Sequence, residues 1–198
     1  MYFGYSPKNG ILHYLFDTYR LLYPKYFALQ ESDHIGSNRI ENAFDFNYST
    51  DSYWVATKPS GHFSVCFPFH SLTIESFELT TSNWSCRPLQ FGAEVSIDGN
   101  MYFGYQEYSP NMTQLQTKRF PFRTDKTEVR CFKFKSIQST CKDTFGYGPD
   151  IDQIEFFGYL TEIKQEVGAF GCKKEIKYTC LVGRNWRFFG LFLPLMFY

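Results

Sequence analysis

Short segments in which apolar side chains alternate with polar or small ones constrain the fold of this chain most strongly. In the stretch HFSVCFPF, residues 62–69, Phe63, Val65, Phe67 and Phe69 recur at every second position. A period of two places these side chains on one face of a β-strand. Further predicted strands, separated by turn-rich stretches, lie at residues 72–80, 91–99, 101–108, 128–137 and 151–160. This succession of short strands predicts an all-β fold, an antiparallel β-sandwich.

The composition supports a packed β-domain and argues against some classes of partner. The chain has 198 residues, of which 43% are hydrophobic, and it contains 23 Phe and 15 Tyr. Aromatic residues favour half-buried strands, and this apolar content is ample for a core. Because 20 basic and 20 acidic residues give a formal net charge of zero, nothing favours nucleic acid or a membrane held by charge alone.

The two ends of the chain differ from the predicted sandwich at residues 30–161. Helical spacing of apolar residues in 10–23, followed by Pro24, predicts a short helix within an N-terminal lead-in, residues 1–29. Residues 162–198 form a predicted C-terminal extension that ends in FFGLFLPLMFY. This final apolar segment has 11 residues. That is too few for a transmembrane helix, which needs about 20. The apolar end is interpreted as an extra packed strand, with a membrane or partner contact as the alternative.

Six cysteines, at positions 66, 86, 131, 141, 172 and 180, show no CxxC spacing. No signal peptide is recognisable at the start of the chain, since charged residues interrupt its apolar positions. These observations predict a cytoplasmic protein whose reduced cysteines act as small apolar side chains. Export would reverse this interpretation, and the glycosylation sequons at Asn47, Asn83 and Asn111 would then become usable.

No metal, cofactor or catalytic motif is predicted. Two sets of residues are candidates for a metal, namely His62, Cys66 and His70, and the loop acids Asp143, Asp150 and Asp152. Four strand residues span about 13 Å, which is too far for one ion to bridge members of the first set. The acids lack EF-hand spacing and are interpreted as a solvated loop. No GxSxG, P-loop or GxGxxG motif is present, so a non-enzymatic role is expected.

Five segments, taken in order, resemble the discoidin family, the coagulation factor V/VIII C-type domains. They are AFDFNYSTDSYWVAT at 43–57, HFSVCFPF at 62–69, SIDGN at 96–100, VRCFKFKSIQST at 129–140 and IDQIEFFGYL at 151–160. The lead-in NGILHYL resembles that of divergent protist members attached to intracellular modules. Secreted members link their two ends by a disulfide, and the lack of a cysteine before Cys66 supports an intracellular branch.

The resemblance implies a galactose-binding-like jelly roll in which residues 151–160 form the closing strand, near the first. Ile154 and Phe156 would then face the core and Glu155 would face outward. Gly158 would let the chain leave the sheet.

In this family ligands bind through loops at one end of the sandwich, which correspond here to residues 32–41, 47–60 and 82–90. The candidate ligand-binding residues in and beside them are Arg39, Tyr48, Tyr53, Lys58, Trp84 and Arg87. Trp54 is expected to pack in the core, whereas Trp84 is equally compatible with packing and with ligand contact. The predicted function is a non-catalytic module that recognises carbohydrate or another anionic or polar ligand. The alternative is a protein-interaction or scaffolding domain, and a hydrolase ranks third.

Overall fold

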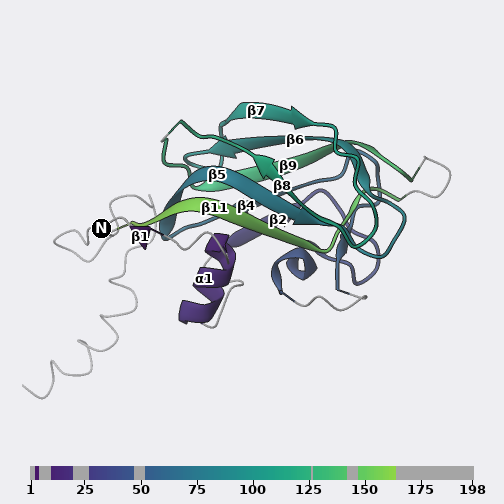
Figure 1. The fold of residues 1–198 in the computed structure, drawn as a ribbon, viewed down its shortest axis with the longest axis horizontal. Coiled ribbons are helices and arrows are strands. Elements are labelled where there is room, and N and C mark those ends of the chain that lie inside the picture. The colour runs from purple at the N-terminus through teal and green to yellow at the C-terminus, as the bar shows by residue number, and fades with distance from the viewer. Residues whose placement is uncertain are drawn as a thin grey trace, which may run out of the picture. The chain divides into compact units, whose positions relative to one another are not determined.

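Two antiparallel β-sheets pack against each other in the computed structural model (Figure 1). The structure describes residues 3–4, 10–19, 27–46, 52–125, 127–141 and 147–163. Its elements are β1 (Phe3–Gly4), α1 (Gly10–Tyr19), β2 (Ala28–Glu31), the 3-10 helix η1 (Ile40–Phe44), β3 (Trp54–Val55), β4 (His62–Cys66), β5 (His70–Thr80), β6 (Pro88–Ser96), β7 (Tyr102–Tyr108), β8 (Thr117–Pro121), β9 (Cys131–Ser139), β10 (Asp150–Ile151) and β11 (Gln153–Glu162).

The strand order explains how distant segments meet. One sheet has the order β1-β11-β5-β8 and the other β2-β4-β9-β6-β7, while β10 and β3 form a separate pair. Every pairing between these strands is antiparallel. The predicted fold class, an antiparallel sandwich with a short N-terminal helix, is therefore confirmed. β1, a strand that the sequence did not predict, pairs with β11, and β11 pairs on its other side with β5.

Phenylalanine rings from both sheets form the centre of the core. The ring of Phe77 in β5 lies 5.0 Å from Phe132 in β9 and 6.2 Å from Phe91 in β6, measured between centroids. The ring of Phe156 in β11 lies 4.9 Å from Phe132. Tilted and edge-on contacts of this kind add to the stabilisation from apolar burial. Trp54 belongs to this core as predicted, because it is fully buried and its indole Nε1 donates to Glu31 Oε2 at 2.8 Å.

Element boundaries differ from the prediction at several places. The helix is described as far as Tyr19, and residues 20–23 lie outside the described residues. β6 ends at Ser96, so Ile97 is exposed and lies in the turn that Asp98 closes with its side chain. The short strands β2 and β8 are not predicted from the sequence, because neither shows a clear alternation of apolar and polar residues.

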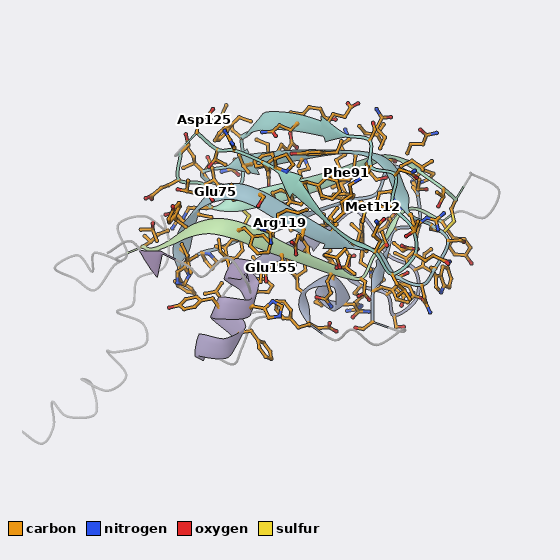
Figure 2. All side chains as sticks on the ribbon, in the orientation of Figure 1. Glu75, Phe91, Met112, Arg119, Asp125 and Glu155 are labelled. Carbon is orange, nitrogen blue, oxygen red and sulfur yellow. A yellow bond between two sulfur atoms is a disulfide. The ribbon has the colours of Figure 1, made fainter. Side chains whose placement is uncertain are left out.

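The closing strand β11 corrects two expectations. Ile154 and Phe156 face the core as predicted, but Glu155 is only 8% exposed because α1 covers that face (Figure 2). Its carboxylate accepts from the backbone N–H groups of Leu12 at 2.7 Å and His13 at 3.0 Å. The first turn of a helix has free N–H donors, so Glu155 caps α1 from a strand 142 residues away in sequence.

Gly158 does not end the strand, since β11 continues to Glu162. It lies at a β-bulge, where Phe157 pairs with Ser76 and Gly158 with Ile74. Its φ is +147°, and a Cβ atom there would lie 2.0 Å from the carbonyl oxygen of Thr73. Glycine is required because the two strands approach each other closely at this point.

The expectation of reduced cysteines is wrong for four of the six. Disulfides join Cys66 to Cys131, between β4 and β9, and Cys86 to Cys141, between two loops. Cys66 and Cys131 stand opposite each other on neighbouring strands, so the antiparallel register brings their side chains together. Spacing along the sequence could not show this pairing. Cys172 and Cys180 lie outside the described residues.

The predicted C-terminal extension lies almost entirely outside the described residues, and the domain boundaries at residues 29 and 161 stay predictions. Within the described part of the chain, no helix has the length and apolar character needed to cross a membrane.

Candidate functional site

An aromatic cluster stands at one end of the sandwich and is built from three loops. The ring of Trp84 lies 5.9 Å from Tyr53 and 5.7 Å from Tyr147. Tyr53 is buried, Tyr147 is half-buried, and Trp84 remains 37% exposed. We call these three residues the aromatic crown. They lie near the start of β11, because β3, which follows Tyr53, pairs with β10, and Thr80 at the end of β5, just before the loop of Trp84, pairs with Gln153. β1 pairs with Leu160, towards the other end of β11.

Hydrogen bonds from the neighbouring loop fix the backbone around Trp84. The Trp84 N–H donates to Ser82 Oγ at 2.9 Å, and the Gln114 side chain donates to the carbonyl of Asn83 at 2.8 Å. Leu115 N–H donates to the carbonyl of Ser82 at 3.1 Å. The 82–87 loop is thus held against residues 111–116, which the sequence did not associate with the site.

The disulfide between Cys86 and Cys141 ties the crown loop to the chain that precedes Tyr147. Beside it, Arg87 N–H donates to Thr140 Oγ1 at 2.9 Å, and Thr140 N–H donates back to the Arg87 carbonyl at 2.9 Å. A covalent link and paired hydrogen bonds together limit how far this loop can move. The crown is therefore pre-ordered rather than formed by a free loop.

The predicted ligand-binding residues fall into four groups. Tyr53 and Trp84 are brought into ring contact, and Arg87 follows Trp84 in the same loop. Lys58 is exposed, and its carbonyl lies close to Gly148, the neighbour of Tyr147. Arg39 is exposed at the start of η1, where its N–H donates to the carbonyl of Ser37 and its own carbonyl accepts from the N–H of Asn42. Tyr48 lies outside the described residues.

Two aspartates interpreted from the sequence as part of a solvated loop are in fact buried close to the crown. Asp150 Oδ2 accepts from the Cys86 N–H at 3.1 Å, and Asp150 is fully buried. Burial raises the pKa of Asp150 to about 6, opposed by this hydrogen bond and by the charge of Arg87. Burial, with the nearby charges of Asp45 and Asp150, raises the pKa of Asp152 to about 7.

These acids do not form a metal centre that the geometry supports. In the part of the chain that the structure describes, no three His, Cys, Asp or Glu side chains converge to hold an ion. Cys66, from the other candidate set, is bonded to Cys131. Asp143 lies outside the described residues.

Sequence reasoning missed Tyr147 because it stands in the stretch CKDTFGYGPD, whose pattern indicates only a loop. It also missed the Cys86–Cys141 disulfide. One signal was present, because a cysteine occurs in each of the two segments that lead to the crown. The burial of Asp150 had no such signal, since its cause is the pairing of β10 with β3.

Comparison with known proteins identifies the fold. No protein-family model matches this chain, and no curated protein sequence matches it significantly. Among solved structures, it is similar to a fragment of a putative chitobiase from Bacteroides thetaiotaomicron, with a TM-score of 0.58, 12% identity and coverage of 72% of this chain and 93% of that one.

Two similar structures from Clostridium perfringens are family 32 carbohydrate-binding modules. One belongs to a family 31 glycoside hydrolase and matches with a TM-score of 0.55 and 12% identity, covering 66% of this chain and 90% of that one. The other, in complex with galactose, matches with a TM-score of 0.51 and 13% identity, covering 67% and 93%. The chain therefore shares the antiparallel β-sandwich fold of these modules.

Proposed function

We propose that this protein is a non-catalytic glycan-binding module whose ligand contacts the aromatic crown. The observation that carries the proposal is the partly exposed Trp84 ring, packed between Tyr53 and Tyr147 at the loop end of the sandwich. An exposed indole held in place by two other rings offers a rigid apolar face. The C–H face of a sugar ring is a ligand of matching shape.

Polar groups around the crown suit the hydroxyl groups of a sugar. Arg87 follows Trp84 in the same loop, and its buried Nε makes no hydrogen bond with the described residues. A guanidinium has several donors in a fixed plane and can bind neighbouring oxygens. The galactose complex of one structural neighbour supports carbohydrate as the ligand class for this fold.

A matched pair of variants tests this proposal. Wild type, Trp84→Ala and Phe103→Ala would be screened by thermal shift against galactose, fucose and GalNAc-β-1,3-galactose. Phe103 is 41% exposed, similar to Trp84, but lies on the edge strand β7. A ligand at 100 times its dissociation constant adds about 2.7 kcal/mol to stability. We expect the shift to disappear in Trp84→Ala and to persist in Phe103→Ala; equal shifts in both variants would contradict the crown as the site.

A second candidate function, protein interaction, is favoured by the edge strand β7. It is the last strand of the five-stranded sheet, and Met101, Phe103 and Tyr105 beside or on it are exposed. Apolar edge strands are common sites of strand addition. If this edge pairs with a second copy, sedimentation equilibrium will show a concentration-dependent dimer that Phe103→Lys abolishes. A constant monomer mass would argue against it.

The disulfides bear on where the protein functions. Two cross-links favour an oxidising compartment, since thiols in the cytosol are kept reduced. The cytoplasmic location stays a prediction, and it no longer has the argument from reduced cysteines behind it. The intracellular branch of the family also stays a prediction. Mass spectrometry of the natural protein after alkylation would distinguish the two locations. A reduced, cytoplasmic protein would gain a label at Cys86 and Cys141, whereas a disulfide-bonded protein would not.

A further inference from the structure

A groove of about 1190 Å³ lies on the outer face of the four-stranded sheet, away from the aromatic crown. Strand β5, strand β8, residues 123–125, Glu128 and Tyr159 of β11 line it. Its main side chains are those of Glu75, Arg119, Arg123, Thr124, Asp125 and Tyr159. Figure 2 shows Glu75 on β5, Arg119 on β8 and Asp125 on the chain that follows β8. The volume exceeds the 300–1,000 Å³ that is usual for small-ligand pockets, so an extended ligand fits better than a single sugar ring.

A β-bulge gives the groove its shape. Because Phe157 pairs with Ser76 and Gly158 with Ile74, Glu75 is the extra residue of β5 and has no partner in β11. Its carbonyl instead accepts from the Phe122 N–H at 2.9 Å, and its side chain is exposed in the groove. Bulges re-aim side chains and are frequent beside functional sites. The bulge therefore presents a carboxylate from rigid strand backbone.

Arg119 is fixed in place on the neighbouring strand β8, opposite Glu78 of β5. Its guanidinium carbon lies 3.6 Å from the centroid of the Phe157 ring, and its Nε donates to Glu78 at 2.7 Å. Stacking on the ring and pairing through Nε hold the guanidinium in one plane. These contacts leave the terminal NH₂ groups as available donors, and Arg119 lines the groove. The arginine is thus oriented before any ligand arrives.

Several polar groups in the groove lack partners among the described residues. Thr124 is 7% exposed, and its Oγ1 makes no hydrogen bond in the described structure. A buried hydroxyl without a partner is unfavourable, and a ligand hydroxyl would satisfy it. Arg123 and Asp125 are exposed, and neither forms an ion pair with a described residue. Tyr159, 43% exposed, adds a ring face to the same surface.

The mixture of charges selects the kind of ligand. Glu75, Asp125 and Glu128 would repel an anionic chain, and Arg119 and Arg123 would repel a cationic one. A hydroxyl group both donates and accepts, so it can bind carboxylates and guanidinium groups alike. The hydroxyl groups of a neutral oligosaccharide can bind both the carboxylates and the guanidinium groups, and its sugar rings can stack on Tyr159. We propose that this groove is a second carbohydrate-binding site, for a neutral oligosaccharide chain, independent of the aromatic crown.

The test measures binding by isothermal titration calorimetry with full-length protein. The probes are hexasaccharides of β-1,4-glucose, β-1,4-xylose, β-1,4-mannose and β-1,4-N-acetylglucosamine, each compared with its monosaccharide. The variants are Tyr159→Ala, Arg123→Gln and Trp84→Ala. Tyr159→Leu keeps most of the volume and replaces Tyr159→Ala if that protein melts early. Arg123 is exposed, so its substitution leaves the fold intact.

We expect one hexasaccharide to bind while its monosaccharide does not. Tyr159→Ala and Arg123→Gln should each weaken that binding about tenfold or more, and Trp84→Ala should leave it unchanged. Loss in Trp84→Ala alone would overturn the groove and support the crown. Loss of hexasaccharide binding in Tyr159→Ala and Arg123→Gln alone would support the groove as a binding site, whether or not the crown binds a glycan. Equal binding by all variants, or no binding of any probe, would overturn the groove as a neutral-glycan site.

Discussion

The aromatic crown and the sheet groove are built by opposite means. The crown consists of loop residues held by a disulfide and by contacts between rings. The groove consists of strand residues placed by a bulge, with an arginine fixed on a phenylalanine ring. A site on loops needs cross-links to become rigid, whereas a site on strands takes its rigidity from the ladder. Ligand binding at the two sites should therefore respond differently to a given substitution.

Removing the disulfides should give the largest effects. Cys86 and Cys141 are 55 residues apart, and Cys66 and Cys131 are 65 apart. Loops of this size predict a loss of about 4 kcal/mol in the free energy of unfolding for either pair. We expect the double variants Cys86→Ser/Cys141→Ser and Cys66→Ser/Cys131→Ser to lose similar stability in urea titrations.

The two double variants differ in their effect on ligand binding. Only the first frees the loop that contains Trp84, so only it should weaken galactose-type ligands at the crown. Each variant is the other's control, because the stability losses match. Loss of crown binding in both would mean that general softening of the fold, and not the local cross-link, governs the site.

Gly158 is the position at which a substitution should disrupt the groove. A Cβ atom there would meet the carbonyl oxygen of Thr73 at 2.0 Å, and backbone cannot rotate away. We expect Gly158→Ala to cost about 3 kcal/mol and to abolish hexasaccharide binding while crown binding persists. Gly36→Ala is the control, since Gly36 has a φ of +58° but a Cβ added there would have no atom within 4 Å. It should cost only about 1 kcal/mol. Equal losses would show that conformation alone, without the close approach, is responsible.

The contrast between a site on loops and a site on strands also explains which features could be predicted from the sequence. Alternation of Phe63, Val65 and Phe67 was enough to predict strands, and the order of several short strands was enough to predict a sandwich. Trp84 could be named because a tryptophan among polar residues stands out. The groove could not be predicted, since Glu75 and Arg119 lie on different strands, and only the pairing of β5 with β8 brings them to the same surface. The burial of Glu155 could not be predicted either, because the helix that covers it is brought there by a tertiary contact.

The smallest expected effect concerns the buried charge near the crown. Burial and the charges of Asp45 and Asp150 raise the pKa of Asp152 to about 7, from an ordinary value of 3.8. A carboxyl whose pKa is raised by folding stabilises the protein fully below its unfolded pKa, and that contribution is lost as the pH rises through about 7. Wild type should therefore lose stability between pH 5 and pH 8. Asp152→Asn should flatten this profile and be more stable at pH 8 by about 1–2 kcal/mol.

Asp98→Asn is the matched control for this pH series. Hydrogen bonds from the N–H groups of Asn100 and Met101 lower the pKa of Asp98 to about 2, so its contribution is lost only as the pH falls below about 4. Its variant should keep the wild-type slope between pH 5 and pH 8. Urea titrations at pH 5, 6, 7 and 8 give the comparison. A slope in Asp152→Asn as steep as that of wild type would assign the pH dependence to another group, of which Asp150 and Glu155 are the next to substitute, because burial raises the pKa of each.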